Sequence, residues 1–497
     1  MTRPQSPLRH IDFGFSFGGR GDANPKPPAD TFTILLAADF AAASDTAPHT
    51  PLNLDIDNLD DLFLRFAPEI PLSGELERHA LHPKHPDDLH PDALLRTFSP
   101  LARLLDLRKR LRKPETAADA AREAEAILGA SEDPSASTPP TSPSTDRRDD
   151  SAPAGASSLE DLLGGRPSEH SSTPSASAAD RARDLIKSLV SGASVPAQSA
   201  SHAALITRLE AALASTLRTL LADPAFRAVE NAWHAAHRLI TSVEVGETLR
   251  VRIVQCAADD LRNPDAPAIA SIIEAIKEGA VGSARPDLIA ILHDAEPDDA
   301  TAETLARLGS AAARADAVCI AGAAPALVGA DTFVSLDPDA FQSPASLHAD
   351  WWSRVTSNGS VAFTLPRFLN RLPHGPADPI DTFDFNEIDP AALGSRQAHD
   401  AYAWCPASLL VAIAAAQSFL DGRNAAMLGL PAEIQSLPLH TWKPADAAAT
   451  GPVAKPIAEI WLTESQGERL GSWGLIPVLS VKGRDSVRVG PVAPPRV

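Results

Sequence analysis

The clearest pattern of apolar positions lies between residues 223 and 240, in the phrase DPAFRAVENAWHAAHRLI. Asp223 can cap a helix, and Pro224 suits the first turn, where its missing N–H leaves no hydrogen bond unmade. Side chains three or four residues apart then share one face: Phe226, Val229, Trp233, His237 and Ile240. The other side carries Arg227, Glu230, Asn231 and Arg238. The pattern predicts a packing helix with an aromatic stripe and a polar back.

Strict alternation near the start predicts a strand in the phrase HIDFGFSF, residues 10–17. Its apolar side is formed by Ile11, Phe13, Phe15 and Phe17. A Gly/Pro-rich tract at 18–30 separates it from the next apolar segment. A terminal strand with one apolar face completes a sheet, either in its own domain or in a neighbouring molecule by β-augmentation, and the pattern leaves both open.

Further apolar runs predict strands and helices in alternation along the rest of the chain. Strands are expected at 31–38, 52–56, 248–257, 286–292, 315–320, 457–464 and 474–481. Helices are expected from about 58 to 67, 101 to 111 with a helical tail to about 128, 203 to 221, 302 to 313 and 407 to 420. The sequence therefore predicts a mixed α/β (α+β) fold, with β-sheets flanked by helices.

A polar tract divides the chain near its first third. Residues 131–158 contain no Leu, Ile, Val or Phe and cannot bury a core, so a flexible linker is expected. Two apolar islands follow, SSLEDLLGG at 157–165 and ADRARDLIKSLV at 179–190, each either a docking helix or a piece that packs on its own domain. We expect a domain at 1–130, a disordered linker with short amphipathic helices at 131–200, and a larger region at 201–497.

Composition excludes several classes of function. The chain has 44 Lys and Arg residues against 64 Asp and Glu residues, which gives a formal net charge of −20 at pH 7. Such an acidic chain is unlikely to have a nucleic acid as its main partner, because nucleic acids are themselves negatively charged. The sequence lacks an apolar run of about 18 residues and a signal-peptide pattern, so neither membrane insertion nor export is expected, and a cytoplasmic location is predicted. The three cysteines form no C-x-x-C pair, and no phosphate-binding glycine motif is found, so no cofactor is expected.

Three groups of polar residues are candidate chemical sites. His79, His82, His85 and His90 lie among prolines without an i,i+4 pair, which favours a solvated loop over a metal site. Asp39 and Asp294 follow buried strands, where doubly wound enzymes place catalytic carboxylates, but Asp is also favoured where strands leave a sheet. Arg367 and Arg371 would share a face if helical and could bind an anion, but Glu387 favours an ion pair, internal or between subunits.

Longer phrases of this chain resemble two proteins of one machine. Residues 8–128 resemble the small subunit of the type VI secretion contractile sheath through HIDFGFSFGG, TFTILLAADF, PLNLDIDNLDDLFLRFAPEI and DLHPDALLRTFSPLARLLDLRKRL. Residues from about 203 to 489 resemble the large sheath subunit, and the phrases that carry this are ordered along the chain. They are the helix around Trp233, the tandem Trp351-Trp352, FTLPRFLNRLPHG, FDFNEI, AYAWCPASLLVAIAAAQSFL and AEIWLTESQGERLGSWGLIPVLSVKGRDS.

The resemblance implies a fused, non-enzymatic sheath protomer that assembles with other sheath subunits around an inner-tube protein and contracts to propel it. In that family, donated strands link neighbouring protomers, which would assign Ile11, Phe13, Phe15 and Phe17 to such a strand. A sheath-recycling AAA+ ATPase recognises a helix at the place of 157–165, which would make Leu159, Leu162 and Leu163 its anchors. Phe226, Trp233, Arg367, Arg371 and Glu387 fall in the matching phrases and are expected to serve packing or interfaces.

The chain also departs from the family. His374 stands before Gly375 where the family favours Tyr, and large subunits continue through a region beyond the equivalent of residue 497. We therefore keep a second interpretation, a sheath-like accessory protein that caps or regulates the tube without polymerising. A third, an α/β-hydrolase-like enzyme using Asp294 and a histidine, lacks a patterned nucleophile.

Overall fold

The computed structural model describes residues 31–44, 46–129, 197–278, 285–335, 337–421, 432–443 and 452–490. The predicted strand at 10–17 and the islands at 157–165 and 179–190 lie outside these ranges. The chain forms two compact units, one of residues 1–103 with 212–497 and one of residues 104–211. The mixed α/β class is confirmed, because the larger unit is built on a sheet of nine strands flanked by helices.

The sheet has the order β11-β15-β14-β8-β7-β6-β1-β5-β2. Its strands are β1 Phe32–Ala38, β2 Leu52–Leu54, β5 Leu249–Gln255, β6 Leu288–Ala295, β7 Val318–Ala323, β8 Val361–Leu365, β11 Ala432–Ile434, β14 Leu475–Ser480 and β15 Val487–Val489. The six central strands run parallel, β2 pairs antiparallel with β5 at one edge, and β15 pairs antiparallel with both β14 and β11 at the other. The short ladders β3 (Ile70–Pro71) with β4 (Ala80–Leu81), β9 (Phe368–Leu369) with β10 (Trp404–Cys405), and β12 (Thr441–Trp442) with β13 (Val453–Ala454) lie apart from it.

Strand β1 lies inside this sheet, between β5 and β6. Leu36 is opposite Ile253 on one side and Ala290 on the other. Every residue of β1 is buried, as expected for a parallel strand covered on both faces. Residues from both predicted sheath-subunit-like regions therefore share one sheet.

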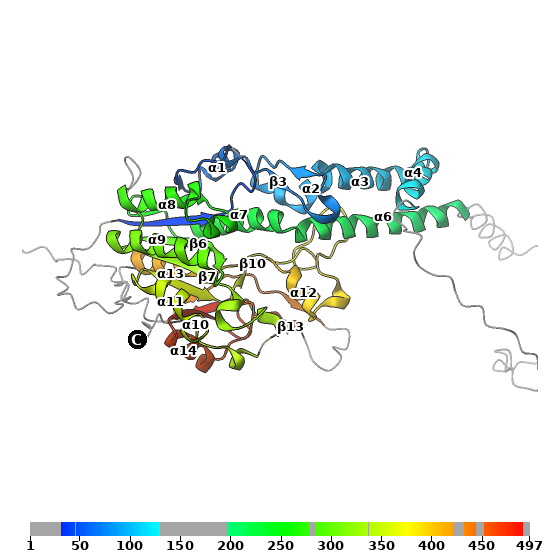
Figure 1. Ribbon diagram of the computed structural model, residues 1–497. Helices are drawn as coiled ribbons and strands as arrows, with labels where there is room; N and C mark the ends of the chain where they lie inside the picture. Colours follow the sequence, from blue (N-terminus) through cyan, green and yellow to red (C-terminus); the bar gives the residue numbers. More distant parts are fainter. Residues whose placement is uncertain are drawn as a thin grey trace, which may run out of the picture. The chain divides into compact units, whose positions relative to one another are not determined.

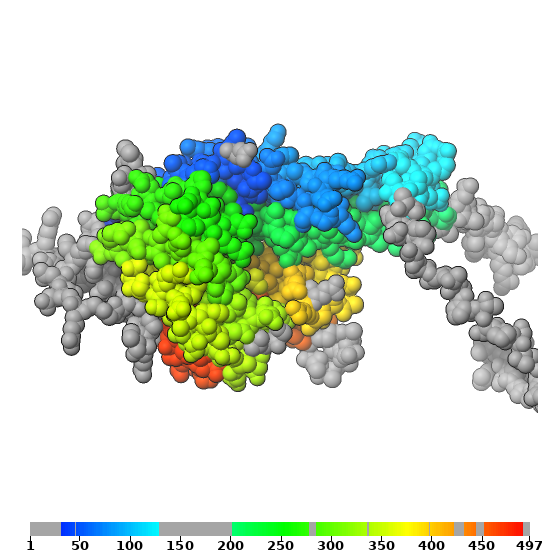
Figure 2. All heavy atoms as spheres, in the orientation of Figure 1, coloured from blue at the N-terminus to red at the C-terminus, as the bar shows by residue number. Residues whose placement is uncertain are grey.

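Helices cover both faces of the sheet (Figure 1). One face packs on α8 (Pro267–Glu278), α9 (Asp299–Ala315), α11 (Ala349–Thr356) and α14 (Glu464–Ser472), in a core that includes Leu35, Ile289 and Phe363. Alternate strand positions point to the other face, where α13 (Ser408–Leu420) contacts β1, β6 and β7, and α7 (Pro224–Ser242) contacts β1. Figure 2 shows the blue N-terminal atoms lying directly against the green atoms from the middle of the chain.

Four shorter helices complete the larger unit: α1 (Leu59–Phe66), α2 (Pro91–Thr97), α10 (Pro344–Leu347) and α12 (Arg396–Ala401). The smaller unit takes in part of α3 (Ser99–Leu111), all of α4 (Ala117–Gly129) and part of α6 (Ala197–Ala222). Within it, Arg108 Nε lies 2.6 Å from Glu210 Oε1, and Arg110 Nη1 lies 2.9 Å from Glu123 Oε2. Of the helices in the described ranges, none has the length and apolar character needed to cross a bilayer.

Two expectations about local structure were wrong. Residues 457–463 do not form a strand: in this segment Ala458 makes only an isolated bridge to Phe368, and α14 begins at Glu464. His237 is exposed rather than part of the packed stripe of α7, since the helical period brings Ala236 to the inner face instead.

Candidate functional site

Helix α7 joins the N-terminal residues to the rest of the larger unit. Its cap forms as predicted, with Asp223 Oδ1 accepting from the N–H groups of Ala225 and Phe226. The other carboxylate oxygen of Asp223 accepts from Ser73, from N–H at 2.8 Å and from Oγ at 2.6 Å. The cap that starts α7 therefore also fixes a loop 150 residues earlier in the chain.

Trp233 is the aromatic centre of this junction. Its ring lies 5.1 Å from Phe40, 4.7 Å from Phe63 and 5.7 Å from Phe66, measured between centroids. Its indole N–H donates to the carbonyl of Phe40 at 2.9 Å. Phe226, the other aromatic residue predicted for packing in α7, is fully buried. Both residues thus pack inside the larger unit.

A second link runs through Asp92 at the start of α2. Its carboxylate accepts from the N–H groups of Asp381 and Thr382, at 2.9 and 3.1 Å. Burial acts to raise the pKa of Asp92, but the hydrogen bonds from Thr382 and Asp381 outweigh it and hold the pKa below its ordinary value. The ionised carboxylate therefore ties α2 to the segment that precedes Glu387.

The polar back predicted for α7 is in part a buried ion cluster. Arg371 Nε lies 2.9 Å from Glu230 Oε1, and Arg371 Nη1 lies 2.7 Å from Glu387 Oε2. The side chains of all three residues are at most 9% exposed. Glu387 also accepts from the backbone N–H of His374 at 2.9 Å. Glu230, which sequence analysis placed among surface residues, is therefore a missed member of this site.

Two carboxylates share one guanidinium, and their pKa values move apart. Burial raises the pKa of Glu230, and the charge of Arg371 only partly offsets this. Burial also acts to raise the pKa of Glu387, but Arg371 and the His374 N–H outweigh it, so this pKa is lowered. Glu387 is therefore the firmly ionised partner of Arg371.

Arg367 belongs to a different cluster, because the segment after β8 is extended rather than helical. Its Nε and Nη2 donate to the two oxygens of Glu459, at 2.8 and 2.6 Å. Burial alone would raise the pKa of Glu459, but the paired hydrogen bonds from Arg367 outweigh this effect and lower the pKa to about 2. Glu459 also contacts His399 Nε2 at 3.1 Å, and His399 Nδ1 in turn lies 2.8 Å from Lys455 Nζ. Arg367 and Arg371, paired in the sequence, thus serve separate buried networks.

A small cavity of about 170 Å³ lies where the central parallel strands end. Asp39, which follows β1, and Asp294, near the end of β6, both line it, beside Arg367 and Cys405. Burial raises the pKa of Asp294 to about 6, and its nearest described cation, Arg367, is 3.9 Å away. Burial also raises the pKa of Cys405, so its thiol stays protonated. The lining thus lacks an activated nucleophile, and the enzyme interpretation gains no support from it.

Two of the four histidines between residues 79 and 90 cap the starts of helices. His85 Nδ1 accepts from the N–H of Asp87, and His90 Nδ1 accepts from the N–H of Asp92, so each caps a short helix. His90, His234, His237 and His374 border a cavity of about 370 Å³. Within the described ranges, His, Cys, Asp and Glu side chains form no group of three suited to a metal ion.

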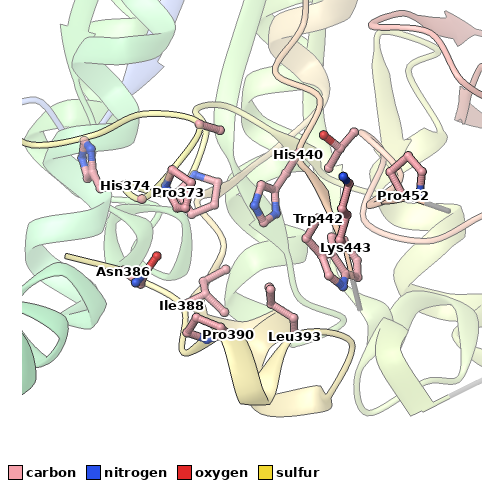
Figure 3. A pocket seen from close by; sticks show the side chains of 14 residues that line it. Pro373, His374, Asn386, Ile388, Pro390, Leu393, His440, Trp442, Lys443 and Pro452 are labelled. Atoms are coloured by element: carbon pink, nitrogen blue, oxygen red, sulfur yellow. The ribbon is translucent and has the colours of Figure 1, made fainter. Parts of the chain in front are cut away.

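A further cavity, of about 410 Å³, lies beside the β12–β13 ladder (Figure 3). His440, Trp442 and Lys443 stand on one side of it, with Pro373, Ile388, Pro390 and Leu393 around the rest. Sequence analysis did not identify this cavity, since its walls come from segments that carry no common motif.

Comparison with known proteins shows the family of this chain. The family described as VipB: EvpB/VC_A0108, tail sheath N-terminal domain, matches residues 203–489. The type VI secretion system sheath protein TssC1 of Pseudomonas aeruginosa is 26% identical over 303 residues, which cover 56% of this chain and 58% of TssC1. The chain thus spans less than two thirds of the length of that relative. Since the family match takes in more than half of the sequence, the chain belongs to the VipB tail sheath family.

Proposed function

We propose that this protein is a structural subunit of a type VI secretion tail sheath, which assembles with other sheath subunits around an inner-tube protein and contracts to propel it. The observation that carries the proposal is the family match over residues 203–489, which includes α7, both arginine clusters and the strands from β5 to β15. The role is non-enzymatic and cytoplasmic. Work would come from the difference in free energy between an extended and a contracted packing of the same subunits.

We further propose that one chain carries the parts of both a small and a large sheath subunit. Three contacts within the larger unit support this, because they join residues from both regions: β1 pairs with β5 and β6, Trp233 packs on Phe40, and Asp223 holds Ser73. A body cross-linked in this way would slide past its neighbours as a unit during contraction, because its own buried contacts would stay closed.

Neighbouring protomers would be linked by the strand at 10–17, inserted into the sheet of the next subunit. Strands β2 and β11 are the outer strands of the described sheet, and each is only three residues long, so an added strand would extend the ladder there. The face formed by Ile11, Phe13, Phe15 and Phe17 would be buried by the acceptor.

Paired substitutions test the strand. Phe13→Asp with Phe15→Asp would place two charges on the buried face and should abolish the sedimentable polymer in ultracentrifugation. Ser16→Asp, on the opposite face of the same strand, is the matched control and should leave the polymer intact. Equal amounts of polymer in both variants would refute strand donation.

We also propose that Leu159, Leu162 and Leu163 anchor the hexameric AAA+ ATPase that recycles contracted sheaths. The basis is the amphipathic spacing of these leucines in the sequence. Leu162→Asp with Leu163→Asp should abolish retention of the ATPase on immobilised protein, whereas Glu160→Gln in the same segment should not. Unchanged retention in the leucine variant would dismiss this assignment.

A further inference from the structure

The outer face of α1 and the turn before it expose apolar side chains. Leu64, on the helix, is 56% exposed, and Ile56, between β2 and α1, is 58% exposed. They are the two most exposed of the large apolar side chains in the described ranges. The inner face of the same helix is packed, since Leu62, Phe63 and Phe66 are buried. Apolar side chains exposed within one short stretch and surrounded by polar residues mark a surface that binds another protein.

The polar residues around Leu64 and Ile56 are mostly carboxylates. Four aspartates and one arginine, Arg65, give residues 55–65 a net charge of −3. Asp57 and Asp61 are exposed, and neither carboxylate has a hydrogen-bond or ion-pair partner among the described residues. Asp61 lies in the first turn of α1, where it complements the helix dipole, but that local role does not require an exposed Leu64. We call Ile56, Asp57, Asp61 and Leu64 the α1 surface.

The chemistry of the α1 surface selects a partner with lysine and arginine side chains. The methylene stems of such side chains can cover Ile56 and Leu64 while their charged heads reach the aspartates. Because Asp57 and Asp61 are unpaired among the described residues, an ion pair with a partner would form there without first breaking another. An apolar centre with a charged rim is also the usual composition of a protein–protein interface.

The chain carries a cationic surface of this kind at the end of α3. Residues 108–113 read RKRLRK, which places five cations in six residues. The three arginines form ion pairs with glutamates of the smaller unit. Lys109 and Lys113, in contrast, are exposed, and their amino groups have no partner among the described residues. We call these two lysines the α3 end. In each surface, two unpaired charges are thus four residues apart, with opposite sign.

We infer that the α3 end of one copy of the chain docks on the α1 surface of the next copy. The two surfaces are different, so the contact is heterologous and leaves each bound copy with one further free surface. Repetition of such a contact builds an open chain or helix rather than a closed dimer. The inference rests on the proposed function, since it names a contact through which sheath subunits would assemble.

Reversal of the charges on each surface tests the contact. Asp57→Lys with Asp61→Lys should abolish concentration-dependent association in sedimentation velocity, and so should Lys109→Glu with Lys113→Glu, because like charges then face each other. An equimolar mixture of the two variants should associate again, because the α1 surface of each then meets an α3 end of opposite charge in the other. Mixing would not restore a contact that forms within one chain.

Two further variants separate charge and apolar contact from general effects. Glu303→Lys with Glu468→Lys changes the net charge by the same amount as the aspartate reversal, at two exposed helical positions outside the α1 surface. This control should associate as the parent does. Ile56→Ser with Leu64→Ser should weaken association about tenfold or more, because it removes the apolar centre of the contact. Circular dichroism would verify that each variant is folded.

The outcomes distinguish the contact from the proposed function. The contact would be overturned if either charge-reversed variant associated alone as strongly as the parent, if their mixture stayed monomeric, or if the parent did not associate at any concentration. A parent that associates without forming tubes in electron microscopy would contradict the sheath function and leave the contact in place. Tubes formed by every variant would support the sheath function and overturn the contact.

Discussion

The buried cluster of Arg371 gives the sharpest prediction for stability. Arg371→Met would leave Glu230 and Glu387 buried together without their shared cation. Removing one side of a buried ion pair costs about 3–5 kcal/mol, because the remaining charge is left uncompensated. The loss should fall in the upper part of this range, since two carboxylates are affected and are held by four contacts of 2.7 to 3.2 Å.

The two carboxylates should not contribute equally. Glu387→Gln removes the ionised partner and weakens the bond to the His374 N–H, so a loss of about 1.5–3 kcal/mol is expected. Glu230→Gln removes a carboxylate whose pKa is already raised by burial and relieves its repulsion with Glu387, so a loss below about 1 kcal/mol is expected. The predicted order of destabilisation is Arg371→Met, then Glu387→Gln, then Glu230→Gln.

Urea unfolding followed by tryptophan fluorescence and by circular dichroism would measure these differences. Arg484→Met is the control, because Arg484 is 68% exposed and lies 4.0 Å from Glu433; a change within about 0.5 kcal/mol is expected. The reasoning would be refuted if Arg371→Met changed the free energy of unfolding by less than about 1 kcal/mol, or if Glu230→Gln cost more than Glu387→Gln.

Three further predictions concern buried ionisable groups. Arg252 is 1% exposed, and its Nε and Nη1 lack hydrogen-bond partners among the described residues, so Arg252→Met should raise the free energy of unfolding by about 1 kcal/mol; a fall of that size would contradict this. Burial and Arg371 lower the pKa of His374 to about 4, so between pH 6.5 and pH 4 this histidine is protonated in the unfolded chain but not in the folded one. The free energy of unfolding should therefore fall by up to about 3 kcal/mol as the pH drops through that window, and His374→Asn should flatten this dependence on pH. For Asp294 the dependence on pH has the opposite sign, because burial raises its pKa to about 6. Its contribution to the free energy of unfolding is present below about pH 3.8 and is lost as the pH rises through 6. Asp294→Asn should therefore be more stable than the parent at pH 7 by about 1–3 kcal/mol, and an equal or lower stability would refute this.

Local structure could be predicted wherever one pattern dominated. The cap at Asp223, the packing of Phe226 and Trp233, and the buried strand after residue 31 follow from helical spacing and from an unbroken apolar run. The segment at 457–463 was misread because an apolar run with one glutamate resembles an edge strand. Glu459 is instead buried because Arg367, 92 residues earlier, compensates its charge.

The pairings between distant segments could not be predicted. Glu230 and Arg371 are 141 residues apart, and a sequence without their spatial contact offers only a glutamate on a helix and an arginine in a loop. The position of β1 between β5 and β6 could not be predicted either, since the sequence of a uniformly apolar strand does not indicate which strands pair with it.

The most direct test of the central claim, that this chain is a polymerising sheath subunit, is electron microscopy of the purified protein across a concentration series, with and without the inner-tube protein. The account predicts hollow, striated tubes whose number rises with concentration or on addition of the inner tube. Discrete particles under every condition would contradict it, and would favour a sheath-like accessory protein that caps or regulates the tube.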